Sequence, residues 1–262
     1  MRKKSSFLIL GLALLAPGLG SASDRHFTYS YESPVLNEGG RELETYTTFR
    51  FGRDHYYSAL DERLEFEIGL GDGIQTSFYL NFTQEMEAQG AGNISNEFLA
   101  DGISNEWKFK LMDNVADIFG MGLYIEPEIK PDELELETKV IIDKKEGPWL
   151  WTLNLTAEPE VHLVDNTSAF SLIPSAGLGL FLADRFMVGI EAQNWNFWQS
   201  QPSEVNYSTL SLGPVLSYTA SNWWVTLTVL PQITDLRTGA LNLTDGEVGQ
   251  KWQTRIATSL AL

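Results

Sequence analysis

The clearest pattern in the chain is a two-residue alternation of apolar and polar side chains from Arg63 to Glu85. Gly71-Asp72-Gly73 interrupts it. Apolar side chains take every second position on both sides of this tripeptide: Leu64, Phe66, Ile68 and Leu70, then Ile74, Thr76, Phe78, Leu80 and Phe82. Because successive strand side chains point to opposite faces, the pattern predicts a β-hairpin with one apolar and one polar face. Glycine and aspartate supply the positive φ of a tight turn, and each arm has about the 9–11 residues that a strand needs to cross a bilayer.

The same alternation recurs along most of the chain and predicts about twelve strands, an even number typical of bacterial barrels. The first strand is expected at 41–51, and the last ends the chain. Short turns are expected at 71–73, 113–117, 144–148, 183–185 and 219–222, and longer loops at 86–103, 158–168, 196–206 and 231–248, with a short exception at 130–132. The predicted fold is all-β: a transmembrane antiparallel up-and-down β-barrel over residues 41–262, with its short turns facing the periplasm.

Period two alone does not separate a membrane barrel from a soluble periplasmic β-sandwich or barrel, which stays the alternative. Aromatic side chains near predicted strand ends favour the membrane, because such rings prefer the headgroup zone. They are Phe49, Phe51, Phe82, Trp107, Trp149, Trp151, Trp195, Trp198, Trp223, Trp224 and Trp252. The polar faces are also charged and bulky, and the chain ends on an apolar residue within a strand.

The N-terminus has the pattern of a secretory signal peptide, expected at residues 1–23. Three basic residues precede an apolar run from Phe7 to Ala16, and small residues follow near Ala22. An uncleaved anchor is the alternative, but the run is shorter than the ~20 residues of a membrane helix. Residues 24–40 are polar, with Pro34 and Gly39-Gly40, and are expected to form a periplasmic N-terminal segment.

The net charge and the cysteine content limit the partners and the chemistry that can be expected of the protein. The formal net charge of −17 becomes −20 when the three basic leader residues are removed, so nucleic acid is not expected as a partner. The chain has no cysteine, which excludes disulfide and thiolate chemistry.

Two segments resemble known Gram-negative outer-membrane barrels. The last strand, from Gln253 to Leu262, is similar to the terminal strand read by the barrel-assembly machinery, although it ends in Leu rather than Phe. Tyr29–Leu36, followed by Gly39–Glu44, resembles an uncharacterised family akin to the transporter-like barrels linked to phenol degradation. The resemblance implies a location in the cell outer membrane. The partners it implies are outer-membrane lipid, lipopolysaccharide and the assembly machinery.

The predicted inward faces carry a cluster of charged side chains. Its members are Glu65, Glu67, Glu126, Glu133, Glu135, Glu137, Arg50, Arg63, Lys108, Lys110, Lys139 and Arg255. A cation-favouring passage with an acidic lumen is one interpretation. The other is a charge network that fills and rigidifies a narrow barrel.

The residues of a catalytic site are scarce. The chain has three histidines, His26, His55 and His162, and His162 with Asp165 is the nearest candidate pair. No catalytic residue, metal site or cofactor is predicted. We therefore expect a non-enzymatic, porin-like channel for small solutes, or a structural barrel. A membrane-embedded hydrolase of lipase or protease type, and a barrel that binds or adheres through loops 86–103 and 231–248, remain the alternatives.

Overall fold

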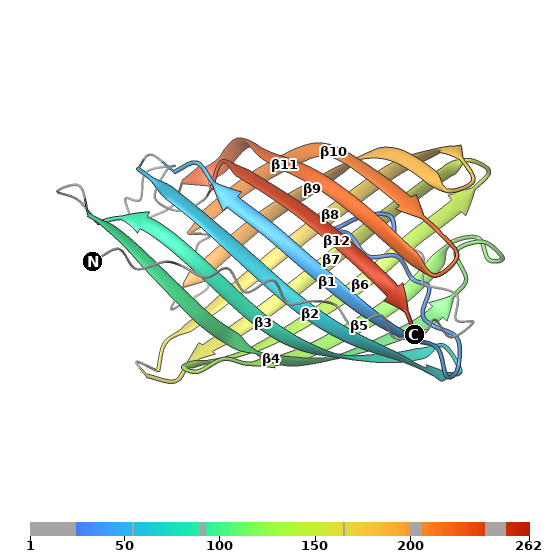
Figure 1. Cartoon of the computed structure of the whole chain (residues 1–262), viewed down its shortest axis with the longest axis horizontal. Helices are drawn as coiled ribbons and strands as arrows, with labels where there is room; N and C mark the ends of the chain where they lie inside the picture. The colour runs from blue at the N-terminus through green and yellow to red at the C-terminus, as the bar shows by residue number, and fades with distance from the viewer. Residues whose placement is uncertain (1–24, 54, 90–92, 165, 200–205, 239–249) are drawn as a thin grey trace, which may run out of the picture.

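The computed structural model describes residues 25–53, 55–89, 93–164, 166–199, 206–238 and 250–262. The predicted signal peptide lies outside the described residues. The chain forms a closed barrel of twelve tilted strands (Figure 1). The strands are β1 (Arg41–Phe51), β2 (Tyr57–Gly71), β3 (Ile74–Ala88), β4 (Ile94–Met112), β5 (Gly120–Ile129), β6 (Glu133–Glu146), β7 (Trp149–His162), β8 (Ser168–Ala183), β9 (Phe186–Gln199), β10 (Tyr207–Thr219), β11 (Trp223–Thr238) and β12 (Trp252–Ala261).

Every strand pairs antiparallel with its sequence neighbours, and β1 pairs with β12 to close the barrel. The closing ladder runs from Glu42 opposite Ala261 to Phe51 opposite Trp252. The predicted fold class is therefore confirmed, and β1 has the predicted bounds. Among the described residues no helix has the length and apolar character needed to cross a membrane.

Several strands run further than their side-chain pattern predicts. The expected loop at 86–103 is mostly paired strand, because β3 continues to Ala88 and β4 begins at Ile94. β9 and β11 likewise continue into the expected loops at 196–206 and 231–248. Cross-strand hydrogen bonds satisfy the backbone whatever the side chains are, so a strand continues where the apolar alternation has ended.

The barrel wall is apolar outside and polar inside. Leu64, Phe78 and Leu80 are exposed, whereas their sequence neighbours Glu65 and Tyr79 are 1% and 2% exposed. This is the inside-out arrangement predicted for a membrane barrel. Trp195 and Trp224, expected among the outer aromatic residues, are instead on the inner face: Trp224 is fully buried and Trp195 lines the lumen. Trp223 and Trp224 are adjacent, so only one of them faces outward.

The two ends of the barrel differ. Residues 72–73, 113–119, 147–148, 184–185 and 220–222 form turns at one end, called here the short-turn end. At the opposite end, called the loop end, β1 leads to β2, β3 to β4, β5 to β6, β7 to β8, β9 to β10 and β11 to β12.

The segment before β1 lies inside the barrel. We expected residues 24–40 in the periplasm, but residues 25–36, called here the plug, lie in the half of the lumen nearer the short-turn end (Figure 1). Inward-facing glycines leave space for them: a Cβ on Gly177 would come within 2.6 Å of the Phe27 ring. The plug has no alternating pattern, because it belongs to no sheet, and this is why sequence periodicity did not place it.

Candidate functional site

The plug is fixed at β9 by one buried carboxylate. Glu191 accepts hydrogen bonds from the backbone N–H groups of Tyr29 at 2.8 Å and Ser30 at 2.5 Å, and from that of Thr28 at 3.3 Å. Thr228 of β11 donates a further hydrogen bond to it at 2.8 Å. Successive backbone N–H groups that converge in this way form an anion-binding concavity. Glu191 thus satisfies donors that have no strand partner.

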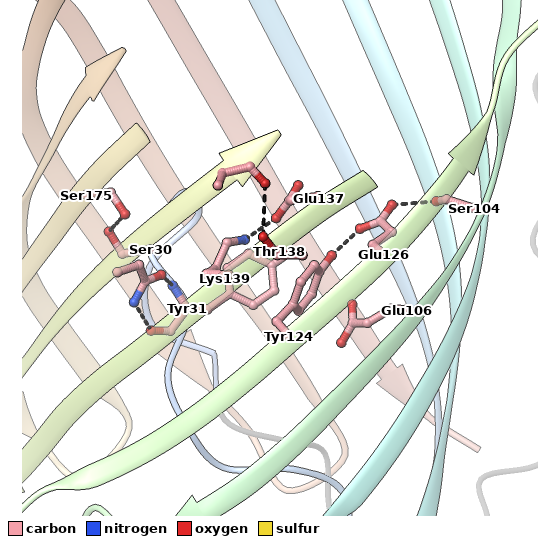
Figure 2. A network of polar contacts seen from close by, with 12 residues as sticks. Ser30, Tyr31, Ser104, Glu106, Tyr124, Glu126, Glu137, Thr138, Lys139 and Ser175 are labelled. Carbon is pink, nitrogen blue, oxygen red and sulfur yellow. Dashed lines mark hydrogen bonds and ion pairs between the residues drawn. The ribbon is translucent and has the colours of Figure 1, made fainter. Parts of the chain in front are cut away.

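From β9 the plug follows the inner wall toward β3. Ser30 Oγ lies 3.2 Å from Ser175 Oγ on β8, and the Tyr31 backbone N–H donates to Asn154 on β7 at 2.5 Å (Figure 2). Further along, the Leu36 N–H donates to Gln75 Oε1 on β3 at 2.9 Å. The plug is therefore attached mainly to wall side chains, and its removal would break no strand ladder.

The Tyr31 ring connects the plug to the charged wall. Lys139 Nζ lies 3.7 Å and Arg25 Cζ 3.8 Å from the centre of this ring, and Tyr124 meets it edge to face at 5.3 Å. Both cations are placed to interact with the aromatic face. Tyr31 is also part of the lining of the open space beyond the plug.

A cavity of about 310 Å³ lies between the plug and the loop end of the barrel. Its walls come from β1, β2, β5 to β9 and β12, with Tyr29 and Tyr31 of the plug. Charged groups of both signs line it: Glu126, Glu128, Glu135, Glu137 and Glu158 with Arg50, Arg63, Lys139 and Arg255.

Most of these charges are paired. Arg63 contacts Glu126 at 2.5 Å, Lys139 contacts Glu137 at 2.5 Å, and Arg50 contacts Asp61 at 2.6 Å. Tyr124 also donates to Glu126, and so does Ser104 at 2.5 Å (Figure 2). The cavity wall is therefore a network of opposite charges that can bind polar groups of either sign.

The predicted charge cluster divides into three places. Arg50, Arg63, Glu126, Glu135, Glu137, Lys139 and Arg255 line the cavity. Glu133 lies near the loop end. Lys130 contacts Glu133 at 2.7 Å there, and the same lysine contacts Glu135 at 2.6 Å. Burial lowers the pKa of Lys130, but these two carboxylates outweigh that effect and the pKa is raised.

The other members lie deeper or at the short-turn end. Lys110 contacts Asp113 at 2.6 Å and, with the backbone N–H groups of the same turn, holds the pKa of Asp113 well below its usual range. Lys108 Nζ is 5.9 Å from the centre of the Tyr31 ring. Glu65 and Glu67 lie apart from the cavity, in a buried group with Glu42, Glu44 and Glu106.

The sequence interpretation missed the contribution of the plug. Tyr29 and Tyr31 line the cavity but precede the first strand, so no strand pattern placed them there. Their aromatic character in an otherwise polar stretch was the available signal.

Each histidine contacts a glutamate. The distances are 3.2 Å from His26 to Glu32, 2.8 Å from His55 to Glu87 and 3.1 Å from His162 to Glu133. His26 and Glu32 both belong to the plug, while the other two pairs lie near the loop end. Asp165, the expected partner of His162, lies outside the described residues.

Comparison with known proteins gives the family. The chain belongs to the Family of unknown function (DUF6662), which matches residues 20–261. No curated protein sequence matches the chain.

Solved structures with a similar fold are outer-membrane barrels. An outer membrane channel from Pseudomonas putida F1 superposes with a TM-score of 0.67 at 9% identity, covering 90% of this chain and all of that one. The KdgM porin gives 0.51 at 9% identity over 84% of this chain and 99% of that one. The β-domain of the Bordetella autotransporter BrkA gives 0.53 at 10% identity, over 86% and 100%. At these identities the likeness shows the fold. The predicted link to phenol degradation finds no support among these matches.

Proposed function

We propose that this protein is a channel for small polar solutes in the outer membrane of a Gram-negative cell, closed at rest by its plug. The observation that carries the proposal is the charged cavity of about 310 Å³ inside a barrel whose other half is filled by residues 25–36. The fold shared with an outer membrane channel supports the proposal.

The chemistry of the lining sets the class of solute. Carboxylates and cationic groups both line the cavity, together with the aromatic rings of Tyr29, Tyr31 and Trp195. A solute with hydrogen-bonding groups, or with charges of both signs, would find partners there. A purely apolar solute would desolvate the charged wall at a cost. The proposed channel function requires no catalytic residue.

The plug can serve as a gate because its attachment is reversible. It contains no cysteine, and its attachment to the wall relies on hydrogen bonds between the plug and wall side chains. Each such bond contributes about 1 kcal/mol net. A structural barrel that never opens is the competing reading.

A reversible tether tests the gate. Ser30 and Ser175 have their hydroxyl oxygens 3.2 Å apart, so the double variant Ser30→Cys/Ser175→Cys places two thiols in reach of a disulfide. We expect the oxidised variant to be silent in a planar bilayer and to conduct in discrete steps after reduction. Wild type is the control, since a chain without cysteine is indifferent to the reductant.

Two results would overturn the proposal. Equal conductance of the oxidised and reduced forms would show that the plug does not close the passage. Silence of wild type and of the reduced variant, with inserted barrels that show heat-modifiable mobility, would favour the structural barrel.

The proposed location in the outer membrane implies contact with lipids and with the machinery that inserts barrels. The exposed apolar outer wall fits outer-membrane lipid and lipopolysaccharide, and insertion would depend on the barrel-assembly machinery. Membrane fractionation of cells that express the full chain should recover it with the outer membrane. Recovery in the soluble periplasmic fraction would contradict this location.

A further inference from the structure

Two neighbouring rows of inward-facing side chains bring five glutamates together beside the plug. In one row Glu42 lies opposite Glu67, Glu67 opposite Ser77, and Ser77 opposite Glu106. In the next row Glu44 lies opposite Glu65. One carboxylate oxygen from each of Glu65, Glu67 and Glu106 lies within 4.8 Å of the other two.

Four carboxylate oxygens in this group have no hydrogen-bond partner among the described residues. They are both oxygens of Glu65, Oε2 of Glu67 and Oε1 of Glu106. These side chains are buried, with residue exposures of 1%, 5% and 1%. The hydroxyl of the fully buried Ser77, between Glu67 and Glu106, is also unpartnered. Four carboxylate oxygens and one hydroxyl without partners in the described structure therefore meet at one place.

The surrounding donors define this arrangement. Gln75 Nε2 donates to Glu67 Oε1 at 2.8 Å, and the Tyr79 hydroxyl donates to Glu106 Oε2 at 2.5 Å. Each donor holds one oxygen of its carboxylate and leaves the other without a partner in the described structure. Carboxylates that bind metal ions are commonly held in this way, by hydrogen bonds from neighbouring side chains.

In the described structure the nearby cations form no ion pair with Glu65, Glu67 or Glu106. Arg25 donates to the Tyr46 hydroxyl at 2.5 Å and to the Phe27 carbonyl at 3.1 Å, and Lys139 contacts Glu137. Lys108 lies within electrostatic reach of Glu106 but makes no ion pair with it among the described residues. Buried like charges that no ion pair compensates are strongly unfavourable.

We propose that Glu65, Glu67 and Glu106 bind a hard divalent cation of the calcium type, with the Ser77 hydroxyl as a further oxygen ligand. Calcium takes oxygen ligands at about 2.3–2.6 Å, so two ligands on opposite sides are about 4.6–5.2 Å apart. The carboxylate separations fit within that span. Zinc is disfavoured, because it prefers histidine and cysteine ligands in proteins.

The site connects to the plug through Gln75. This side chain donates to Glu67 and at the same time accepts the Leu36 N–H at 2.9 Å. A cation that fixes the Glu67 carboxylate would therefore hold Gln75 in the orientation that binds the plug. Calcium should accordingly slow amide exchange at Leu36.

Direct binding is the first test. The refolded full chain, stripped with a chelator, is titrated with Ca²⁺ by calorimetry, and the bound metal is counted after gel filtration. We expect one Ca²⁺ per chain and at least a tenfold loss of affinity in Glu65→Gln. Glu158→Gln is the matched control, because Glu158 is also a lumen carboxylate but lies outside the group; its affinity should equal that of wild type.

A second measurement guards against misfolding. Variants are first checked for heat-modifiable mobility, and thermal unfolding is then followed with and without Ca²⁺. Calcium should raise the midpoint of wild type and of Glu158→Gln, but not that of Glu65→Gln. Absence of Ca²⁺ binding by wild type at millimolar concentration, or binding that Glu65→Gln leaves unchanged, would overturn the proposal in favour of carboxyl groups that share protons.

Discussion

At the scale of single residues, the plug depends most on Glu191. Its carboxylate is fully buried and receives three successive backbone N–H groups of the plug. A buried N–H without a partner is costly, and a segment that pairs with no strand has to find acceptors among side chains. Glu191 meets this need with its two carboxylate oxygens, and a carboxylate accepts stronger hydrogen bonds than a neutral oxygen does.

The variant Glu191→Gln should therefore loosen the plug. A glutamine keeps one acceptor oxygen but turns an NH₂ group toward the plug donors. Charge-assisted bonds contribute about 1.5–3 kcal/mol each and neutral ones about 1, so we expect a loss of about 3 kcal/mol. This corresponds to roughly a hundredfold larger population of the released plug. Amide exchange at residues 28–30 measures it.

A control separates this effect from the loss of any lumen charge. Glu158 lines the same lumen, and in the described structure it forms no hydrogen bond to the plug. Glu158→Gln should leave exchange at residues 28–30 unchanged. Equal acceleration in both variants would contradict a specific role for Glu191.

At the scale of elements, the plug and β8 are shaped to each other. Phe27 is fully buried against the inner face of β8, where Gly177 leaves the space for its ring. An added Cβ at 177 would lie 2.6 Å from two atoms of that ring. The contact is between ring and strand, so it affects plug docking without touching the barrel ladder.

Gly177→Ala should destabilise the docked plug by about 1–3 kcal/mol, the usual cost of overpacking. Phe27→Ala should cost about 3–5 kcal/mol through lost packing. The double variant should be more stable than the sum of the two losses, because the smaller side chain at 27 removes the clash. Exchange protection of plug amides reports each step.

Gly122→Ala is the matched control for this pair. Gly122 also lies on the inner wall beside the plug, but an added Cβ there would be 3.5 Å from its nearest neighbours. That separation is ordinary contact, so plug protection should persist. Additive losses in the Phe27 and Gly177 double variant would contradict the proposed contact.

The strands were predictable from sequence, whereas the plug was not. Leu64, Phe66 and Ile68 alternate with polar residues because one face of β2 meets lipid and the other meets the lumen. This difference between the faces produces a two-residue pattern that can be read from the sequence. Residues 25–36 obey no such demand, since a ring of strands surrounds them. Their location depends on distant partners such as Glu191 and Gln75.

The candidate site was predicted in part for the same reason. Alternation placed Glu126, Glu137 and Lys139 on the inner face, and the structure puts them in the cavity wall. Which charges pair, and which gather without partners, depends on the register of neighbouring strands. Glu67 and Glu106 are separated in sequence but meet across Ser77, and no local pattern encodes that meeting.

At the scale of the whole molecule, the strong negative charge is unevenly distributed. The described cavity lining holds five carboxylates and four cationic groups, so the passage is much closer to neutral than the chain. Selectivity should therefore depend on individual pairs in the wall. Net charge acts over distances that salt screens, about 8–10 Å at physiological ionic strength.

Removing one carboxylate from such a pair should shift the ion preference of the open channel. Glu137 contacts Lys139 at 2.5 Å, and Glu135 contacts Lys130 at 2.6 Å. In Glu137→Gln or Glu135→Gln the lysine is left without that partner, so local cation occupancy should fall. A unit charge at 4 Å in water is worth about 1 kcal/mol, or roughly fivefold. The reversal potential in a salt gradient, measured with the reduced tether variant, should move toward anions.

Glu62→Gln distinguishes the lumen wall from the total charge. It makes the same change in net charge, but Glu62 alternates with the inward-facing Asp61 and Arg63 and accepts a hydrogen bond from Thr47 at 3.0 Å on the outer face. If the wall sets selectivity, the reversal potential of this variant should equal that of the reduced tether variant without the Glu62 substitution. An equal shift in all three variants would mean that the field of the whole barrel selects the ion, and that the paired charges of the cavity only stiffen its wall.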